Sequence, residues 1–406
     1  MAKTVALEGP ALTWARDQFA QYYGSTAIPP PSRLERREFA AFPFVTDTTM
    51  RRHTTLRSPE EFRRFLVGGV PRHVYYSTAY YRLPAEPTMA RKEWLGADLL
   101  FDLDADHLRG AAALDYAGQL ALVKTRLIDL VDDFLLGDFG IPPEELTFVF
   151  SGGRGYHVHV RDARFLPLTS PERRELVDYI QGTGFDARRV VAPRHLNVGG
   201  EDGADGRRRS TLRLQELPSP DSPGWRGRTA RAVLALLDRW ESGGSAEADL
   251  LAWGIPKPHA RRMARVLFQQ GGAARVRASH NLDALGPLQE EFLEAVVPRA
   301  AVEVQGETDA PVTTDIHRLI RLPGSLHGGT GFRVMPVARD ALEKFEPLRD
   351  APVPRPAGER VSITFQETVH YPWGDDTLDG TPGAEGEVPT AAALFLTLRG
   401  EASLRL

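Results

Sequence analysis

The stretch FSGGRGYHVHV, from Phe150 to Val160, joins two strand-like segments through Ser-Gly-Gly-Arg-Gly. LTFVF leads into it and YHVHV ends it, so the pattern predicts strand, loop and strand. Glycines allow positive φ and let a bound group approach the backbone closely. Successive backbone N–H groups in such a loop can form an anion-binding nest, and Arg154 adds a planar set of donors that suits phosphate. The stretch therefore indicates a hairpin that binds phosphate at its tip.

The hairpin carries two histidines two residues apart. Side chains alternate along a strand, so His157 and His159 point to one face and the intervening residues point to the other. The pattern leaves three interpretations open: a triphosphate site with a histidine beside it, a glycine-rich hairpin with one satisfied core histidine, or a His-x-His metal pair. A Ser-His-Asp hydrolase built on Ser151 and His157 is disfavoured, because no G-x-S-x-G elbow precedes a helix here.

A second strand candidate, LLFDLDAD at residues 99–106, carries a row of carboxylates. Asp102, Asp104 and Asp106 share one face of a strand whose other face is apolar. Carboxylates two residues apart on a strand have Cα atoms ~7 Å apart, so their side chains can converge on one divalent cation or bracket two. Hard oxygen ligands suit Mg²⁺ or Mn²⁺. The alternative is a strand end with solvated aspartates.

A third stretch, TDAPVTTDIHRLIRLPGSLHGGTGFRVMPV, occupies residues 308–337. Thr314 can cap a short helix over 315–322, which would carry Arg321 and end at the following proline. A glycine-rich turn then leads into a strand at 332–337. An acid, an arginine and a histidine beside a glycine-rich turn repeat the chemistry of the first two stretches: carboxylate for metal, and arginine and histidine for phosphate.

Hydrophobic periodicity elsewhere predicts an α/β (α+β) protein. The sequence divides into the first part of a core at 1–220, an inserted small helical subdomain at 221–300, and the second part of the core with a C-terminal tail at 301–406. Residues 197–228 are rich in Gly, Asp, Pro and Arg and are interpreted as a surface loop. VSITFQETVHY, at 361–371, is interpreted as an edge strand.

Composition excludes several classes of protein. The chain of 406 residues is 42% hydrophobic and 26% charged, as is typical of globular proteins, and its formal net charge of -4 confines any nucleic-acid site to a local patch. The absence of cysteine excludes disulfides and cysteine-ligated zinc. There is no apolar run long enough to span a membrane, and the first residues lack a signal-peptide pattern. We therefore expect a cytoplasmic protein with no membrane partner.

Together, the three stretches resemble the catalytic small subunit of the archaeal and eukaryotic-type DNA primase. SGGRGYHVHV matches the family's SGxRGxHxxV, and FDLDAD contains its DxD. DAPVTTDIHRLIRLPGSLHGGTG matches its distal D…R/K-x-P-x-S-x-H-x-x-T-G. The motifs follow in the family's order, and the resemblance extends from about Arg37 to the turn after Thr330. It is strongest toward archaeal members and implies a mixed-sheet primase catalytic core.

Catalytic roles follow from the resemblance. Asp102 and Asp104 match the family's first two metal-binding catalytic aspartates. The family's third aspartate stands 18 residues before the histidine of the distal motif, which selects Asp309 rather than Asp315. The resemblance thus implies two Mg²⁺ or Mn²⁺ ions held by Asp102, Asp104 and Asp309.

The resemblance also implies a site for the incoming nucleotide. Ser151, Arg154 and His157 match the family's triphosphate loop. Arg321 stands where the family has a basic residue toward the phosphates, and His327 matches the second histidine of the family.

Three further positions are compared with the family's sequence pattern. Glu38 in REFAAF and Arg52 in MRRHTTL resemble its N-terminal nucleotide-site elements, whereas His159 is expected to support the hairpin. Many relatives carry a Cys/His zinc knuckle between the DxD and the SGxRG motif. That interval has no cysteine here and only His107, so no zinc is expected.

The implied function is template-directed synthesis of short primers on single-stranded DNA, from NTPs or dNTPs, by two-metal nucleotidyl transfer during replication. The implied partner is the primase large regulatory subunit, in a heterodimer. Two other functions remain open. The polymerase domain of bacterial end-joining ligases has similar motifs, although RLIRLPGSLHGGTG favours the primase. The second is a non-catalytic nucleic-acid-binding subunit, against which the three aspartates argue.

Overall fold

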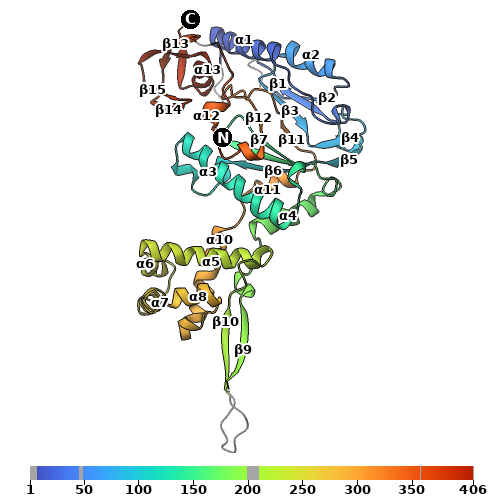
Figure 1. Cartoon of the computed structure of the whole chain (residues 1–406). Coiled ribbons are helices and arrows are strands. Elements are labelled where there is room, and N and C mark those ends of the chain that lie inside the picture. The colour runs from blue at the N-terminus through green and yellow to red at the C-terminus, as the bar shows by residue number, and fades with distance from the viewer. Residues whose placement is uncertain (1–6, 45–48, 199–209, 357, 406) are drawn as a thin grey trace, which may run out of the picture. The chain divides into compact units, whose positions relative to one another are not determined.

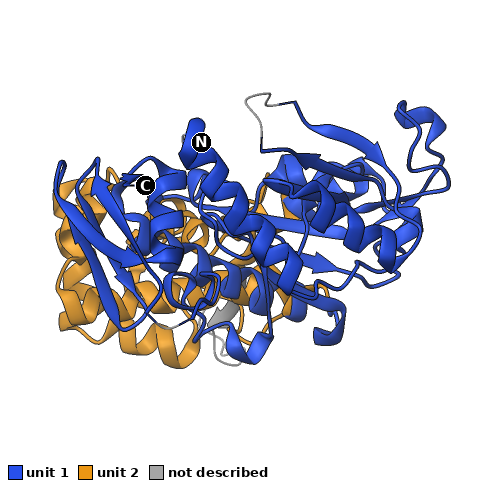
Figure 2. Ribbon diagram, turned by 90° about the horizontal axis from the view of Figure 1, so that it is seen from above, with its two compact units in different colours: residues 1–136, 140–177, 307–406 blue, residues 137–139, 178–306 orange. Residues whose placement is uncertain are grey.

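The computed structural model describes residues 7–44, 49–198, 210–356 and 358–405 (Figure 1). The chain divides into two compact units (Figure 2). Unit 1 contains residues 1–136, 140–177 and 307–406, and unit 2 contains residues 137–139 and 178–306. The predicted insert at 221–300 falls within the larger span of unit 2, and its own boundaries stay a prediction.

The central sheet of unit 1 is antiparallel, with the strand order β12-β7-β8-β6. Every residue of β8 is buried, so the histidine face and the valine face of this strand are both covered. The helix α3 contacts β6 and β8. Helices thus combine with small antiparallel sheets, and the fold is α+β, as predicted. The expected mixed sheet is wrong, because all strand pairings among the described residues are antiparallel. The elements named here are β6 (Leu99–Asp104), β7 (Leu146–Phe150), β8 (Gly155–Val160), β12 (Met335–Val337) and α3 (Tyr116–Asp129).

A second sheet of unit 1 has the strand order β11-β3-β1-β2. Two helices, α1 and α2, lie along it (Figure 1), and Phe19, Phe39 and Phe62 from these helices and the sheet join in one apolar core. A short two-stranded sheet, β4 with β5, follows β3 in the chain. The bounds are α1 (Gly9–Ser25), β1 (Phe39–Phe42), β2 (Arg51–Thr54), α2 (Pro59–Gly69), β3 (His73–Ser77), β4 (Ala79–Tyr81), β5 (Trp94–Ala97) and β11 (Leu319–Arg321).

The helix predicted over 315–322 is wrong. A short helix, α11 (Ala310–Thr314), ends where the predicted one would begin, and β11 follows it. Thr314 is therefore the last residue of a helix and not a cap. In β11, Ile320 is buried between two half-buried neighbours and pairs with Tyr76 of β3. This pairing with a distant strand overrides the local helical pattern.

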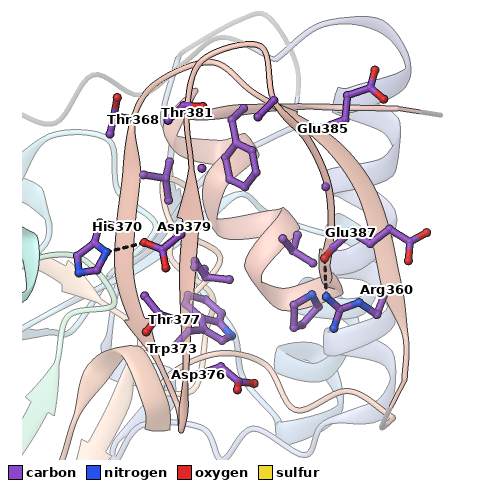
Figure 3. A pocket seen from close by; sticks show the side chains of 18 residues that line it. Arg360, Thr368, His370, Trp373, Asp376, Thr377, Asp379, Thr381, Glu385 and Glu387 are labelled. Atoms are coloured by element: carbon purple, nitrogen blue, oxygen red, sulfur yellow. Dashed lines mark hydrogen bonds and ion pairs between the residues drawn. The ribbon is translucent and has the colours of Figure 1, made fainter.

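The C-terminal part of unit 1 contains two small sheets and the buried helix α13 (Thr390–Arg399). The prediction of an edge strand at 361–371 is wrong. β13 (Arg360–Phe365) is a central strand between β16 (Glu385–Pro389) and β17 (Ala402–Leu404), and the later residues belong to β14. β14 (Val369–Trp373) pairs with β15 (Asp376–Gly380). The sheets border an open cavity of about 850 Å³ with acidic walls (Figure 3), which none of the predicted site residues lines.

The described residues of unit 2 form helices and one pair of antiparallel strands. Trp240, Leu237 and Phe292 lie in its apolar core. The loop predicted at 197–228 is confirmed at 217–223 and wrong in the rest of its described part, which the end of strand β9, strand β10 and the start of helix α5 occupy; residues 199–209 lie outside the described residues. The elements are β9 (Ala192–Val198), β10 (Ser210–Glu216), α5 (Gly224–Gly243), α6 (Ala246–Ala252), α7 (Lys257–Gln269), α8 (Gly272–Ser279), α9 (Gln289–Glu291) and α10 (Val297–Glu303).

Two further helices are α4 (Ser170–Gln181) and α12 (Pro347–Asp350). The start of α4 is stabilised by Glu172, whose carboxylate accepts the backbone N–H of Thr169 (2.7 Å). Among the helices of the described ranges, none is both long enough and apolar enough to cross a membrane.

Candidate active site

The predicted row of carboxylates begins on β6, which pairs with β8. The register places Asp102 opposite His157 and Asp104 opposite Gly155. A Cβ on Gly155 would stand 2.5 Å from a carbonyl oxygen of β6, so only glycine allows the strands to approach so closely here. β6 ends at Asp104, whose carboxylate accepts the N–H of Asp106 (3.0 Å). Asp106 therefore lies in a tight turn beyond the strand, and not on the predicted strand face.

Asp309 approaches these carboxylates from a distant part of the chain. Its backbone N–H donates to the carbonyl oxygen of Asp102 (2.9 Å), and it has extended backbone angles directly before α11. Burial, and then the negative charges of Asp104 and Asp309, raise the pKa of the Asp102 carboxyl to about 7. The three carboxylates therefore interact at one place in unit 1.

Asp315, the alternative to Asp309, stands at the other end of α11. Its carboxylate accepts the backbone N–H of His317 (2.9 Å) and so closes the turn that leads into β11. This is a local structural role of the kind that short acidic side chains take in turns. It differs from the predicted place in the first turn of a helix.

The three carboxylates suit a hard divalent cation. A buried carboxyl among like charges needs a positive partner, and Mg²⁺ and Mn²⁺ prefer carboxylate oxygens as ligands. Basic side chains stand beside two of them: Arg154 lies 3.7 Å from Asp104, and His107 lies 3.8 Å from Asp309. Within the described ranges, no three His, Asp or Glu side chains are arranged to hold a metal ion as they stand.

The glycine-rich turn between β7 and β8 is ordered by Ser151. Its hydroxyl oxygen accepts the N–H groups of Gly153 and Gly155 (3.3 Å each), so these two groups are not free to form the predicted anion nest. Gly152 has a positive φ of 77°, and a Cβ there would stand 2.6 Å from the Cβ of His327. The glycine therefore lets the turn contact the distal motif directly.

Arg154 lies at the tip of the same hairpin. Its guanidinium forms an ion pair with Asp106 and stands beside Asp104. The preceding carbonyl, that of Gly153, accepts the hydroxyl of Tyr116 (2.7 Å), which anchors the tip to α3. Arg154 is thus held by carboxylates, with which a phosphate would compete for the guanidinium.

His157 lies beside the carboxylates, with Nε2 3.5 Å from a carboxylate oxygen of Asp102. Burial, and then the positive charges of Arg321 and Arg318, lower the pKa of His157 to about 3. The ring is therefore neutral near pH 7. His159 is buried on the same face and stacks on an aromatic ring of β3, with ring centroids 6.3 Å apart. Its contacts are those of a packing residue.

Arg321 and His327 stand next to each other in the distal motif. Arg321 ends β11, and its Nη1 donates to Nδ1 of His73 (3.0 Å) and to the Tyr75 hydroxyl (2.9 Å). The His327 ring meets the His73 ring edge-on, with centroids 5.3 Å apart, and its Nδ1 lies 3.1 Å from the Thr330 hydroxyl. Burial, and then the charge of Arg321, hold the pKa of His327 well below its ordinary value.

Sequence reasoning missed three residues at this site: Arg72, His73 and Arg318. Arg72 Nε donates to the carbonyl of Gly328 (2.9 Å), and its charge lowers the pKa of His327. Arg318 lowers the pKa of Asp102. One signal for His73 was available, because alternation along HVYYS places it on the same face as Tyr75. Its partners, however, lie far away in the sequence.

Glu38 and Arg52 form a separate cluster. The Glu38 carboxylate is fully buried and accepts from Arg52 Nε (3.0 Å) and from the backbone N–H of His53 (3.2 Å). The buried ammonium of Lys92 lies 3.3 Å from it. Removing one partner of such a buried ion pair is strongly destabilising. The Glu38 carboxylate therefore holds these side chains and the backbone of His53 in place. The described contacts do not join it to the carboxylates on β6.

Contacts and charges link the eight predicted site residues into one site, in which carboxylates face arginines and neutral histidines across a glycine-rich turn. This is the arrangement of an enzyme that transfers phosphate-bearing groups, where positioning and charge carry most of the catalysis. The eight are Asp102, Asp104, Asp309, Ser151, Arg154, His157, Arg321 and His327.

Comparison with known proteins places this site in a family. The sequence model of the DNA primase small subunit matches residues 101–339. The DNA primase small subunit PriS of Methanocella arvoryzae is 38% identical over 398 residues, which cover 95% of this chain and 97% of that protein. PriS of Methanococcoides burtonii is 38% identical over 396 residues, covering 96% and 97%. PriS of Halorubrum lacusprofundi is 36% identical over 401 residues, again covering 96% and 97%.

The chain belongs to the family of DNA primase small subunits. It is a catalytic primase, which is a nucleotidyltransferase of DNA replication.

Proposed function

We propose that this chain synthesises short primers on single-stranded DNA by template-directed, two-metal nucleotidyl transfer. The observation that carries the proposal is the hydrogen bond from the Asp309 N–H to the Asp102 carbonyl. This bond holds a third carboxylate beside the two on β6, so a strand end becomes a site with three acidic groups. The distal motif supplies both Asp309 and the arginine and histidine that face phosphates.

Asp102, Asp104 and Asp309 would hold Mg²⁺ or Mn²⁺. When bound, the cations supply the positive charge that lowers the pKa of the primer 3′-hydroxyl and neutralises the attacking and leaving oxygens. The protein keeps these carboxylates close together despite their repulsion, as the raised pKa of Asp102 indicates. The three carboxylates are therefore gathered in one place before a cation arrives.

The triphosphate of the incoming nucleotide would be held by Arg154, Arg321, His157 and His327, beside the turn that Ser151 orders. Both histidines are neutral, so each can donate one N–H without adding a charge. The arginines supply the charge. Arg154 would exchange its bond to a carboxylate for one to phosphate, because an arginine can bind either group with the same planar donors.

The proposed substrates are NTPs or dNTPs, and the proposed template is single-stranded DNA in the cytoplasm. The relatives are named small subunits, which supports a primase large regulatory subunit as the partner in a heterodimer of the primosome. No zinc is required by this account.

A primer-synthesis assay on circular single-stranded DNA tests the proposal, with and without a large subunit. We expect products that start without a pre-existing primer, that require Mg²⁺ or Mn²⁺ and that disappear in EDTA. Extension of annealed primers without any initiation would instead favour an end-joining polymerase. No incorporation under any condition would favour a non-catalytic subunit.

The raised pKa of Asp102 predicts how stability depends on pH in the metal-free protein. The folded carboxyl has a pKa of about 7, and the unfolded one has a pKa of about 4. Between these values the folded state holds a proton that the unfolded state has lost, so stability falls as pH rises toward 8. Asp102→Asn cannot ionise and should be more stable than the wild type at pH 8 by about 1–3 kcal/mol, with a smaller difference at pH 5.

Denaturant unfolding in EDTA at the two pH values measures this difference. Added Mn²⁺ should stabilise the wild type at pH 8 and not the variant, because the variant lacks a ligand. An Asp102→Asn protein that is less stable than the wild type at pH 8 in EDTA would contradict the raised pKa of Asp102.

The purified protein is expected to contain no stoichiometric structural zinc. The chain has no cysteine to bind it, and structural zinc sites rely on cysteine and histidine. Elemental analysis should find less than one zinc per chain, and a zinc chelator should leave the melting temperature unchanged. One zinc per chain together with a large drop in melting temperature would refute this expectation.

A further inference from the structure

His73 makes contacts that its position in the sequence does not suggest. It begins β3, and its Nδ1 lies 3.0 Å from Nη1 of Arg321 and 3.3 Å from the backbone nitrogen of Gly328. Both partners are obligate donors, since a guanidinium and a backbone N–H have no lone pair to offer. Nδ1 must therefore be the acceptor, and the ring is neutral with its proton on Nε2.

The surroundings of His73 favour the same neutral form. Burial, and then the positive charges of Arg321 and Arg72, hold the pKa of His73 well below its ordinary value. A protonated ring here would place a third positive charge beside two arginines and lose its acceptor. The residue thus offers one lone pair at a fixed place and adds no charge.

This single acceptor connects two parts of the distal motif. Arg321 lies at the end of β11, and Gly328 lies in the turn directly after His327. The His327 ring also meets the His73 ring edge-on at 5.3 Å. His73 therefore fixes the arginine and the histidine turn relative to each other, although an eight-residue segment of this kind, with a proline and two glycines, is flexible by itself.

The geometry leaves the rest of the guanidinium available. In the part of the chain that the structure describes, the hydrogen bonds of Arg321 all start from Nη1, toward His73 and the Tyr75 hydroxyl. The Tyr75 ring lies beneath the guanidinium, 5.4 Å from its carbon. Nε and Nη2 are then oriented as a pair that can bind a phosphate.

We propose that His73 is a positioning residue, whose Nδ1 holds Arg321 and the turn at 327–329 in the arrangement that binds the incoming triphosphate. This inference rests on the proposed function, in which Arg321 contacts phosphate. His73 itself touches neither the nucleotide nor the carboxylates. Its loss should weaken nucleotide binding and leave the chemical step largely intact.

Two conservative variants test the inference. In His73→Asn, the amide oxygen can take the place of Nδ1; in His73→Gln, the oxygen stands one bond further out, near the place of Nε2. We expect His73→Gln to raise KM for the nucleotide about 10-fold with kcat within about 3-fold, and His73→Asn to keep both within about 3-fold of wild type. Because both replacements are polar and of similar size, a general packing defect should affect them alike.

His159→Gln is the matched control. His159 is also a buried histidine on a strand, and it stacks on an aromatic ring without contacting Arg321. Its variant should lose stability in thermal melts and keep KM. An equal rise of KM in the control, or in His73→Asn, would overturn the positioning role.

Arg321→Gln, alone and combined with His73→Gln, separates this inference from the proposed function. If His73 acts through Arg321, the double variant has a KM well below the product of the two single effects, since the effects are not additive. Full additivity, with KM raised by the product of both effects, overturns the role of His73 and leaves the proposed function standing. A normal KM in Arg321→Gln overturns the phosphate role of Arg321 and the inference with it.

Discussion

Asp104→Ala is expected to reduce nucleotide incorporation by at least about 10³-fold, because a carboxylate that binds the catalytic cations stabilises the transition state by several kcal/mol. The fold should survive. Asp104 is the last residue of β6, its side chain is 33% exposed, and its carboxylate accepts one backbone N–H, that of Asp106. Single-turnover incorporation and thermal melting, measured side by side, separate the loss of chemistry from a loss of structure.

Asp106→Ala is the matched control for this experiment. Asp106 stands two residues further along the same acidic stretch, but it lies in a turn and forms an ion pair with Arg154. Removing the Asp106 carboxylate breaks its ion pair with Arg154 but leaves the two carboxylates of β6, Asp102 and Asp104, in place. Incorporation should therefore stay within about 10-fold of wild type. Turnover near wild type in Asp104→Ala, or equal losses in both variants, would contradict the assignment of the metal-binding carboxylates.

Asp309→Asn is expected to remove metal-dependent synthesis, whereas Asp315→Asn should retain it. The Asp309 backbone N–H that bonds to Asp102 is kept in the variant, so the segment stays beside β6 and only the charge is lost. Losing one of three cation-binding carboxylates should again cost at least about 10³-fold in rate. At Asp315, the amide oxygen of asparagine can accept the same N–H of His317, and stability should change by less than about 1 kcal/mol.

Parallel single-turnover assays of the two variants, with thermal melts as the structural readout, decide between these aspartates. A dead Asp315→Asn enzyme beside a normal Asp309→Asn enzyme would mean that the spacing of the distal motif has been misapplied. Loss of folding in Asp309→Asn would mean that its carboxylate, and not only its backbone, supports α11.

The parts of the structure that could be predicted are those that the local pattern determines. β6 and the hairpin of β7 and β8 follow from alternation interrupted by glycines, and glycine is required at Gly152 by its positive φ and at Gly155 by the close approach of β6. The pairing of Asp102 with His157 then follows from the register. The selection of Asp309 relied on the spacing of a family motif, since no local pattern brings it beside Asp102.

The parts that could not be predicted depend on partners far away in the chain. β11 is three residues long and is stabilised by pairing with β3, so its local helical pattern was misleading. His73 and Arg321 stand 248 residues apart, and an isolated histidine at the start of a strand gives no sign of such a contact. Both errors concern the same place, where the distal motif meets β3.

A structure of the protein with Mn²⁺ and a non-hydrolysable nucleotide triphosphate, measured with anomalous scattering at the manganese edge, tests the central claim most directly. The claim is that Asp102, Asp104 and Asp309 hold the cations and that Arg321 and the distal histidine turn hold the triphosphate. The account predicts anomalous peaks bonded to these three carboxylates, with Arg154 released from Asp106 and the phosphates against Arg321. Manganese bonded to other residues, or a triphosphate bound away from Arg321, would contradict it.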